Sequence, residues 1–226
     1  MCLIVAAWRV HDAWPLIVAA NRDEFHRRPA SPAAFWSDKP HILGGRDLEA
    51  KGTWMAVSRS GRFAAVTNYR GAKEPSAAES RGALVTRFLD GSEAAATYVE
   101  KLVQNQNSYS GYNLLACDGE ELWWTSNRDS APRRLERGCY ALGNLLLDSA
   151  DVLPLKDRAR EVVEAAPGIE PLFSLTAPAR IVNEQYGTRC STVCMIGGGT
   201  IRYAERTFAP DGGEGETLYF EFSAQR

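Results

Sequence analysis

The sequence has few histidines and none of the cysteine spacings that hold a metal ion or haem. Three histidines are present, all before residue 42, and five cysteines are scattered through 226 residues without a CxxC or CxxCH motif. Zinc sites take four nitrogen, sulfur or oxygen ligands at characteristic spacings, and covalent c-type haem attachment needs CxxCH. We therefore expect no metal site and no disulfide framework.

Long apolar runs and an excess of one charge are also lacking. No segment approaches the roughly 20 apolar residues that a membrane helix needs. The apolar start, residues 3–8, is too short for a signal-peptide core and follows no basic segment. The net charge of -2 argues against a nucleic-acid surface, which needs a basic excess. We expect a cytoplasmic protein with no transmembrane segment, no nucleic-acid partner and a small-molecule ligand.

Most of the chain shows the apolar runs and turn signals of β-hairpins. Apolar runs at residues 3–8 and 15–20, joined by a short polar connection, predict a first hairpin that is buried on both faces. Segments that flank turn residues predict further strands. These segments are 53–58, 62–68, 112–117, 121–125, 139–143, 191–196, 200–206 and 218–222.

Helical periodicity is confined to three segments. It predicts helices near residues 83–89, from a cap at Ser92 to about residue 104, and from about 152 to 165. Residues 167–187 are expected to be irregular, with one helical turn near Leu172. Many hairpins with few helices and no linker predict the α+β class, with helices packed on antiparallel sheets in a single domain over residues 1–226.

Cys2 is the first candidate for chemistry. Removal of Met1 leaves a free α-amine on Cys2, with an ordinary pKa of about 7.7–8.0. One residue then holds both a thiol nucleophile and a general base, as in N-terminal threonine and cysteine hydrolases. The alternative is an incidental cysteine at the start of a buried strand, because free cysteine is among the most buried residue types.

A dense polar cluster follows the second apolar run and is formed by Asn21, Arg22, Asp23 and Glu24. Pairing of the first hairpin sets Cys2 opposite residue 21 or 22. Arg22 can lower the thiol pKa or bind a carboxylate, and Asp23 can position the α-amine. The alternative is a surface turn with an ion pair of small energetic value.

Other polar residues stand at the ends of later predicted strands. Asn68 and Asn144 can donate amide N–H groups to an oxyanion, or serve only as turn residues. Arg189 can bind an anionic ligand group or lie on the surface. Trp54 and Tyr69, beside these strand ends, are candidates to line a ligand pocket.

These elements form an ordered set of motifs. They are Met1-Cys2-Leu3-Ile4, Ala19-Ala20-Asn21-Arg22-Asp23-Glu24-Phe25, Arg28-Pro29, Gly45-Arg46-Asp47, Gly52-Thr53-Trp54, Thr67-Asn68-Tyr69-Arg70, Gly143-Asn144, Gly187-Thr188-Arg189 and Glu205-Arg206. In these motifs the chain resembles the NRDE family, also called the transport and Golgi organisation protein 2 family, over nearly its whole length. That family resembles N-terminal-nucleophile (Ntn) hydrolases such as penicillin V acylase and bile-salt hydrolase, which implies an αββα sandwich of antiparallel sheets.

The resemblance also implies roles for individual residues. Cys2 matches the nucleophile, Asp23 the aspartate that positions the amine, Asn144 an oxyanion asparagine and Arg189 the later catalytic arginine. Asn68 is a looser match. The expected ligand-binding residues around these four are Asn21, Arg22, Glu24, Trp54, Asn68 and Tyr69.

Members of the family are linked to haem trafficking and to lipid and acyl-CoA homeostasis. The resemblance therefore implies an intracellular haem-handling protein whose pocket is centred on Cys2, with haem as the transported ligand and no catalytic cofactor. The first alternative is an enzyme, an N-terminal-cysteine amidohydrolase of small non-peptide amides. The second is a non-catalytic lipid- or acyl-CoA-related binding protein. His11, His26 and His41 are expected to be ordinary surface or loop residues.

Overall fold

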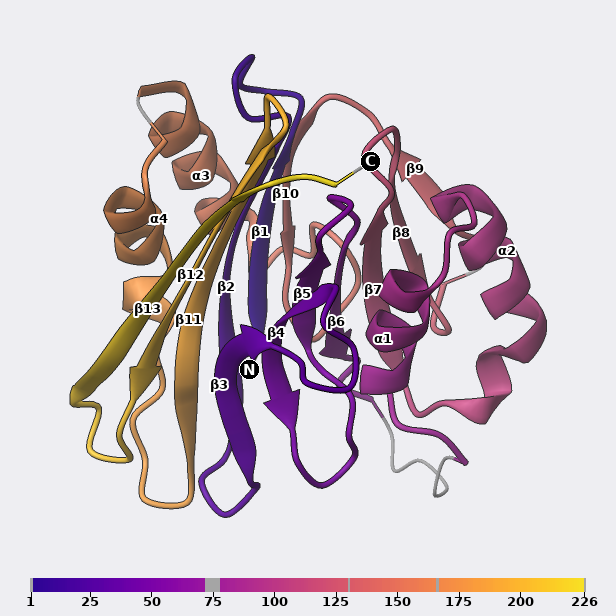
Figure 1. Cartoon of the computed structure of the whole chain (residues 1–226). Helices are drawn as coiled ribbons and strands as arrows, with labels where there is room; N and C mark the ends of the chain where they lie inside the picture. The colour runs from indigo at the N-terminus through magenta and orange to yellow at the C-terminus, as the bar shows by residue number, and fades with distance from the viewer. Residues whose placement is uncertain (1, 72–77, 130, 166, 226) are drawn as a thin grey trace. The chain divides into compact units, whose positions relative to one another are not determined.

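The computed structural model describes residues 2–71, 78–129, 131–165 and 167–225 (Figure 1). Met1, whose removal the small residue Cys2 permits, lies outside these ranges. The chain forms two compact units. The first unit is Met1–Arg28, Arg137–Gly143 and Leu147–Ala224, and the second is Pro29–Glu136, Asn144–Leu146 and Gln225–Arg226.

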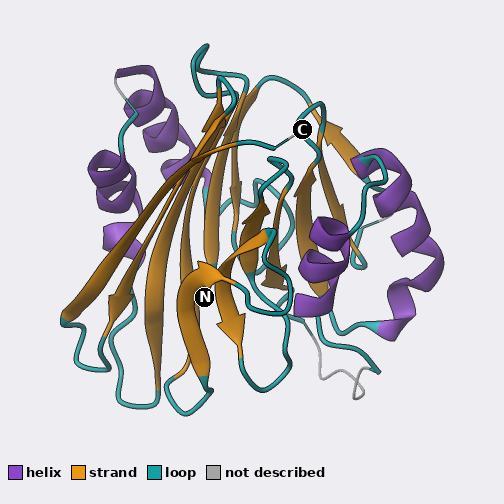
Figure 2. Ribbon diagram, in the orientation of Figure 1, coloured by secondary structure: helices purple, strands orange, loops and turns teal. Residues whose placement is uncertain are grey.

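The first unit is built on a six-stranded antiparallel sheet in the order β10-β1-β2-β11-β12-β13. Its strands are β1 (Leu3–Trp8), β2 (Leu16–Phe25), β10 (Gly138–Leu142), β11 (Tyr186–Gly197), β12 (Thr200–Phe208) and β13 (Glu214–Ser223). Its helices are α3 (Leu153–Ala165) and α4 (Ile169–Thr176), with a 3-10 turn at Ala177–Ala179. Both helices lie along one face of the sheet (Figure 2).

Hydrophobic burial holds these helices on the sheet. Ala159 and Val163 of α3 and Phe173 of α4 join one buried cluster with alternate residues of the central strands, such as Val5 and Ile17. Alternate residues of a strand share one face, so this cluster occupies the helix-covered face. The strand residues that alternate with these, such as Ile4 and Val18, lie on the other face of the sheet.

The second unit is built on a seven-stranded antiparallel sheet in the order β3-β4-β5-β6-β7-β8-β9. Its strands are β3 (Ala30–Phe35), β4 (Ile42–Asp47), β5 (Met55–Ser58), β6 (Phe63–Asn68), β7 (Tyr112–Cys117), β8 (Leu122–Ser126) and β9 (Arg133–Leu135). Its helices are α1 (Gly82–Asp90) and α2 (Ala95–Asn105), with a 3-10 turn at Gln106–Ser108. Phe88 of α1 and Val99 of α2 share a buried cluster with Ala64 and Leu114 of the sheet.

The predicted α+β class is confirmed, because the described residues form two antiparallel sheets and four α-helices. The first hairpin pairs Ala6 with Val18, as expected. The β5–β6 turn places Gly61 at a φ of 84°, a backbone conformation that suits glycine. Three strands, β3, β4 and β9, were not predicted. In the described part of the chain, no helix combines the length and the apolar character that crossing a membrane requires.

Two local predictions are wrong. The single helical turn expected near Leu172 is in fact the eight-residue helix α4 (Ile169–Thr176), which buries Leu172 and Phe173 against the sheet, so residues 167–187 are less irregular than expected. Ser92 does not cap α2, which starts after Ala94 and has no side-chain cap in its own sequence. Instead the carboxylate of Asp118, from the β7–β8 turn, accepts a 2.7 Å hydrogen bond from the Ala95 N–H. A residue 23 positions away therefore satisfies this helix end.

Candidate functional site

The polar cluster lies inside strand β2 rather than beyond its end. Strand β2 continues to Phe25 because β11 pairs with it along this length. The exposed fractions of Asn21, Arg22 and Asp23 are 2%, 5% and 4%. Burial of three consecutive polar residues excludes a surface turn, and buried polar groups require hydrogen-bond partners.

The register of the first hairpin brings Cys2 to this cluster. Leu3 pairs with Asn21, so Cys2 comes opposite Arg22, as predicted from the sequence. The half-buried Cys2 thiol donates a hydrogen bond to the backbone carbonyl of Asp23, with an Sγ–O distance of 3.5 Å. The Tyr186 hydroxyl donates to the same carbonyl at 3.1 Å.

Thr188 holds the carboxylate of Asp23. Its hydroxyl donates a 2.6 Å hydrogen bond to Asp23 Oδ1 and accepts a 2.8 Å hydrogen bond from the Ile181 N–H. Thr188 is itself 3% exposed and pairs with Asp23 across the β2–β11 ladder. The two hydrogen bonds orient the Thr188 hydroxyl, and this hydroxyl fixes one oxygen of the Asp23 carboxylate on β2, the strand that pairs with β1 directly after Cys2.

Burial raises the pKa of the Cys2 thiol above its ordinary value, and the nearby Asp23 carboxylate raises it further. The Arg22 guanidinium lowers the pKa of Cys2, but by less than burial and Asp23 raise it. The sequence suggested Arg22 as a group that lowers this pKa, and its effect is outweighed. The thiol is therefore protonated at neutral pH, and a reaction at its sulfur needs a base that takes the proton.

Asn21 ties the strands to the helical layer. Its Oδ1 accepts a 2.7 Å hydrogen bond from the Ser191 hydroxyl on β11, and its Nδ2 donates a 2.9 Å hydrogen bond to the Thr176 carbonyl at the end of α4. All three residues are buried. The Asn21 amide thus has partners on the helix-covered face, where its register partner Leu3 also lies.

Arg189 lies at an irregularity in β11, between the paired residues Thr188 and Cys190. Its Nη1 donates hydrogen bonds of 3.1–3.2 Å to three backbone carbonyls, those of Phe25, His26 and Arg28. Burial, and then the Arg22 charge, lower the Arg189 pKa. The structure therefore gives Arg189 a role in holding the segment that follows β2.

Glu24 is half-buried and turns toward the same segment. Its Oε1 accepts a 2.8 Å hydrogen bond from the Phe25 N–H, and its Oε2 lies 3.9 Å from Arg28 Nε. These contacts are local in sequence. Glu24 thus stabilises the turn after β2.

Sequence reasoning assigned no role to Glu205, which is 1% exposed on β12. Burial and then the Glu205 carboxylate raise the pKa of Cys190 well above its ordinary value, whereas Arg22 opposes the shift. Cys190 pairs with Arg22 across the ladder. Arg22, Cys190 and Glu205 therefore form a buried group beside the Cys2 strand. The Glu205-Arg206 motif was the only sequence signal for it.

The remaining candidates belong to the second unit. Asn144 is 8% exposed, and its Nδ2 donates a 2.7 Å hydrogen bond to the Asn68 carbonyl. The Arg70 N–H donates to the Asn144 carbonyl at 2.6 Å. The structure thus brings Asn68 and Asn144 together. Tyr69, which follows Asn68, and Trp54, whose carbonyl accepts a hydrogen bond from the Val66 N–H, are both half-buried. The oxyanion role of Asn144 stays a prediction.

Asn113 was not predicted and is fully buried on β7. Its Nδ2 donates to Thr67 Oγ1 at 3.2 Å and to the Leu145 carbonyl at 2.9 Å. It therefore anchors the segment next to Asn144. Its only sequence signal was a polar residue within an apolar strand.

Each of the three histidines contacts another group of the chain. His11 Nδ1 accepts a hydrogen bond from the Ala13 N–H, His26 Nε2 lies 2.9 Å from the Asn183 carbonyl, and His41 Nε2 lies 3.1 Å from Asp90. Within residues 2–71, 78–129, 131–165 and 167–225, no group of three or more His, Cys, Asp or Glu side chains is placed to hold a metal ion.

The fold is that of the N-terminal-nucleophile hydrolases. A mutant of conjugated bile acid hydrolase from Clostridium perfringens superimposes with a TM-score of 0.57 at 10% sequence identity, over 99% of this chain and 98% of that one. The Transport and Golgi organisation 2 family model matches residues 1–168. The chain belongs to this family.

Curated relatives match over nearly their full length. The Transport and Golgi organization protein 2 homolog of Bos taurus is 32% identical over 260 aligned residues, which cover 95% of this chain and 94% of that protein. The human homolog is 31% identical with the same coverage. The motifs that suggested the family in the sequence therefore correspond to a true relationship.

Proposed function

We propose that this protein is an N-terminal-cysteine amidohydrolase that cleaves a small, non-peptide C–N amide bond. The observation that carries the proposal is the Cys2 thiol held 3.5 Å from the Asp23 carbonyl, beside a carboxylate that Thr188 fixes. Because the thiol is protonated, it needs an adjacent base to take its proton during attack, and the Cys2 α-amine can serve as that base. The fold of the hydrolases supports the same reaction class.

The reaction needs only the Cys2 thiol and α-amine, the amide substrate and water. After Met1 is removed, the Cys2 α-amine accepts the thiol proton while Sγ forms a bond to the amide carbon. The tetrahedral intermediate collapses as the C–N bond breaks, and the leaving amine takes the proton. Water then hydrolyses the thioester and releases the acid, so the reaction as written needs no cofactor.

Asp23 and Asn144 have separate roles in this proposal. The Asp23 carboxylate orients the α-amine, because an anion favours an adjacent ammonium group. The family resemblance implies an oxyanion role for Asn144, of a kind worth about 3 kcal/mol in a closed site, and this role stays a prediction. The solved structure from Clostridium perfringens that shares this fold is the C2A mutant of a conjugated bile acid hydrolase. That hydrolase is altered at its own residue 2, which supports a role for Cys2 in this chain.

The test is turnover of a panel of N-acyl amino acids and N-acyl amines, with release of the amine as the readout. Cys2→Ala and Cys2→Ser must abolish turnover, whereas Cys139→Ala, which changes a buried cysteine elsewhere, must retain it. An intact-mass measurement accompanies the assay. Retention of Met1 in an active protein contradicts the α-amine mechanism.

Haem handling is the second candidate, and the observation that favours it is also Cys2. Its partly exposed thiol is a soft sulfur ligand for iron, whereas His26 and His41 have contacts of their own. In this case haem is cargo. Titration with haem must give a saturable spectral change that Cys2→Ser alters, and a titration without one removes this candidate. The lipid or acyl-CoA alternative stays a prediction.

A further inference from the structure

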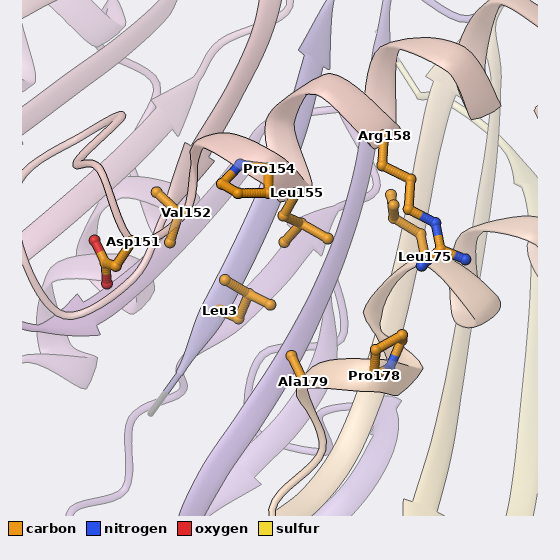
Figure 3. A pocket seen from close by; sticks show the side chains of 9 residues that line it. All are labelled: Leu3, Asp151, Val152, Pro154, Leu155, Arg158, Leu175, Pro178 and Ala179. Carbon is orange, nitrogen blue, oxygen red and sulfur yellow. The ribbon is translucent and has the colours of Figure 1, made fainter.

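A separate cavity opens on the helix-covered side of the first unit, next to β1. It has a volume of about 290 Å³, close to the lower end of typical small-ligand pockets. Its lining comes from β1, from the segment before α3 and the first turns of that helix, from the end of α4 and from the 3-10 turn that follows it (Figure 3). The residues are Leu3, Asp151, Val152, Pro154, Leu155, Arg158, Leu175, Pro178 and Ala179.

The inner surface of this cavity is apolar. Leu3, Val152 and Leu175 are 3%, 2% and 1% exposed, and they form its floor. Leu3 and Val152 belong to a small hydrophobic cluster distinct from the main cluster under α3 and α4, with Leu155 and Ala179 packed against it. An apolar chain that enters the cavity is removed from water, and this favours binding roughly in proportion to the buried area.

The two charged residues of the lining stand at opposite ends. The Arg158 side chain extends beside Leu175, whereas Asp151 lies next to Val152 (Figure 3). Among the described residues, no hydrogen bond or ion pair engages the Arg158 guanidinium. Two neighbouring cationic side chains do form ion pairs: Lys156 pairs with Asp148, and Arg180 pairs with Glu214. Arg158 is thus a cation available at one end of an apolar floor.

We infer that this cavity binds an alkyl monocarboxylate, with the carboxylate on Arg158 and the chain over Leu3 and Val152. A guanidinium pairs with a carboxylate through two parallel hydrogen bonds, which makes arginine well suited to this headgroup. Asp151 at the far end disfavours a second carboxylate through like-charge repulsion. The site is distinct from the Cys2 site, because the residues that line the cavity do not include Cys2, Arg22 or Asp23.

The first test is calorimetric titration of the full chain with unbranched alkyl carboxylates. The chain carries Cys2→Ala so that no turnover occurs, and each carboxylate is used below the concentration at which it forms micelles. Affinity is expected to rise about fourfold per added methylene until the chain fills the cavity. Octanoate must bind at least tenfold more tightly than octanedioate and octylamine. Equal binding of the three ligands, or no saturable octanoate binding, overturns the inference.

Two variants with matched controls locate the binding. Arg158→Gln must weaken octanoate at least tenfold and leave octanol unchanged, whereas Arg160→Gln, on the same helix, must leave both unchanged. Ala179→Phe fills the cavity and must abolish binding, whereas Ala177→Phe, in the same turn but outside the lining, must not. If octanoate binds equally to the Ala179→Phe protein, the cavity is not the site. If octanoate binds wild type and not the Cys2→Ala protein, the ligand belongs to the Cys2 site instead.

Discussion

The hydroxyl of Thr188 donates a 2.6 Å hydrogen bond to the carboxylate of Asp23 across the β2–β11 ladder. Thr188 is the last regularly paired residue before the irregularity that contains Arg189. The position of Thr188 opposite Asp23 therefore depends on where the β2–β11 pairing changes register. This contact links the strand next to Cys2 with a residue 165 positions away, and it defines the geometry on which the proposed chemistry depends.

Thr188→Val removes the hydroxyl at nearly constant shape. We expect a loss of about 1–3 kcal/mol in the free energy of unfolding, because Asp23 Oδ1 and the Ile181 N–H both lose this partner. In the proposed reaction kcat falls at least tenfold with little change in KM. Thr188→Ser keeps the hydroxyl and restores most of both quantities. Urea unfolding and steady-state kinetics measure the effects, and a Thr188→Val protein with normal kcat denies Thr188 a positioning role.

Asp23→Asn is expected to speed alkylation of Cys2. The Asp23 carboxylate is the second cause, after burial, of the raised thiol pKa, so its neutralisation lowers that pKa and raises the thiolate fraction. The asparagine Oδ1 can still accept from Thr188. Iodoacetamide labelling followed by peptide mapping across a pH series measures the shift, with Glu24→Gln as the control. An unchanged or higher midpoint pH for Cys2 labelling refutes this electrostatic assignment.

Arg189→Gln is expected to destabilise the first unit by about 1–3 kcal/mol, because Nη1 no longer joins three carbonyls after β2. Arg202→Gln removes an exposed ion pair with Glu221 and is expected to change stability by about 0.5 kcal/mol or less. Chemical denaturation compares the two. If Arg189→Gln keeps full stability and loses turnover, Arg189 acts on the substrate, as the family resemblance implies.

The protein is expected to lose stability in strong alkali. Burial, and then Tyr109, raise the pKa of Tyr112 to about 12. The folded state therefore holds this proton where the unfolded state has released it. The stabilisation, of the order of 2–3 kcal/mol, is present below about pH 10 and is lost as the pH rises through about 12. Tyr112→Phe must make the dependence between these pH values less steep in urea unfolding, whereas Tyr98 and Tyr203, whose pKa values burial also raises, keep part of it. An equally steep dependence in the variant assigns the loss to other groups.

The sequence predicted the elements whose signals are local. The first hairpin has two apolar runs around a short polar connection, so the register that sets Cys2 opposite Arg22 follows from counting. α4 was missed because its eight residues lie between Pro167-Gly168 and Pro178 and give little periodicity. β3 was missed because it is mostly half-exposed and contains a proline.

Roles that depend on distant pairing could not be predicted. The bond between Thr188 and Asp23, and the proximity of Glu205 to Cys190, arise from the β2–β11–β12 ladders. The contacts of Asn21 depend on the fold in the same way, because its partner Thr176 is the last residue of a helix of which the sequence predicted only one turn. The identities of these residues were visible in the sequence, but their neighbours were set by the sheet order.

The most direct test of a nucleophilic Cys2 is intact-mass spectrometry after brief exposure to an activated acyl ester, followed by peptide mapping. Cys117, Cys139, Cys190 and Cys194 are all buried, so the map separates the half-buried Cys2 from the rest. The proposed mechanism predicts a chain without Met1 that gains one acyl group, held as a thioester on Cys2, and no adduct in Cys2→Ser. A chain that retains Met1, or that shows no acyl group on Cys2, contradicts the mechanism.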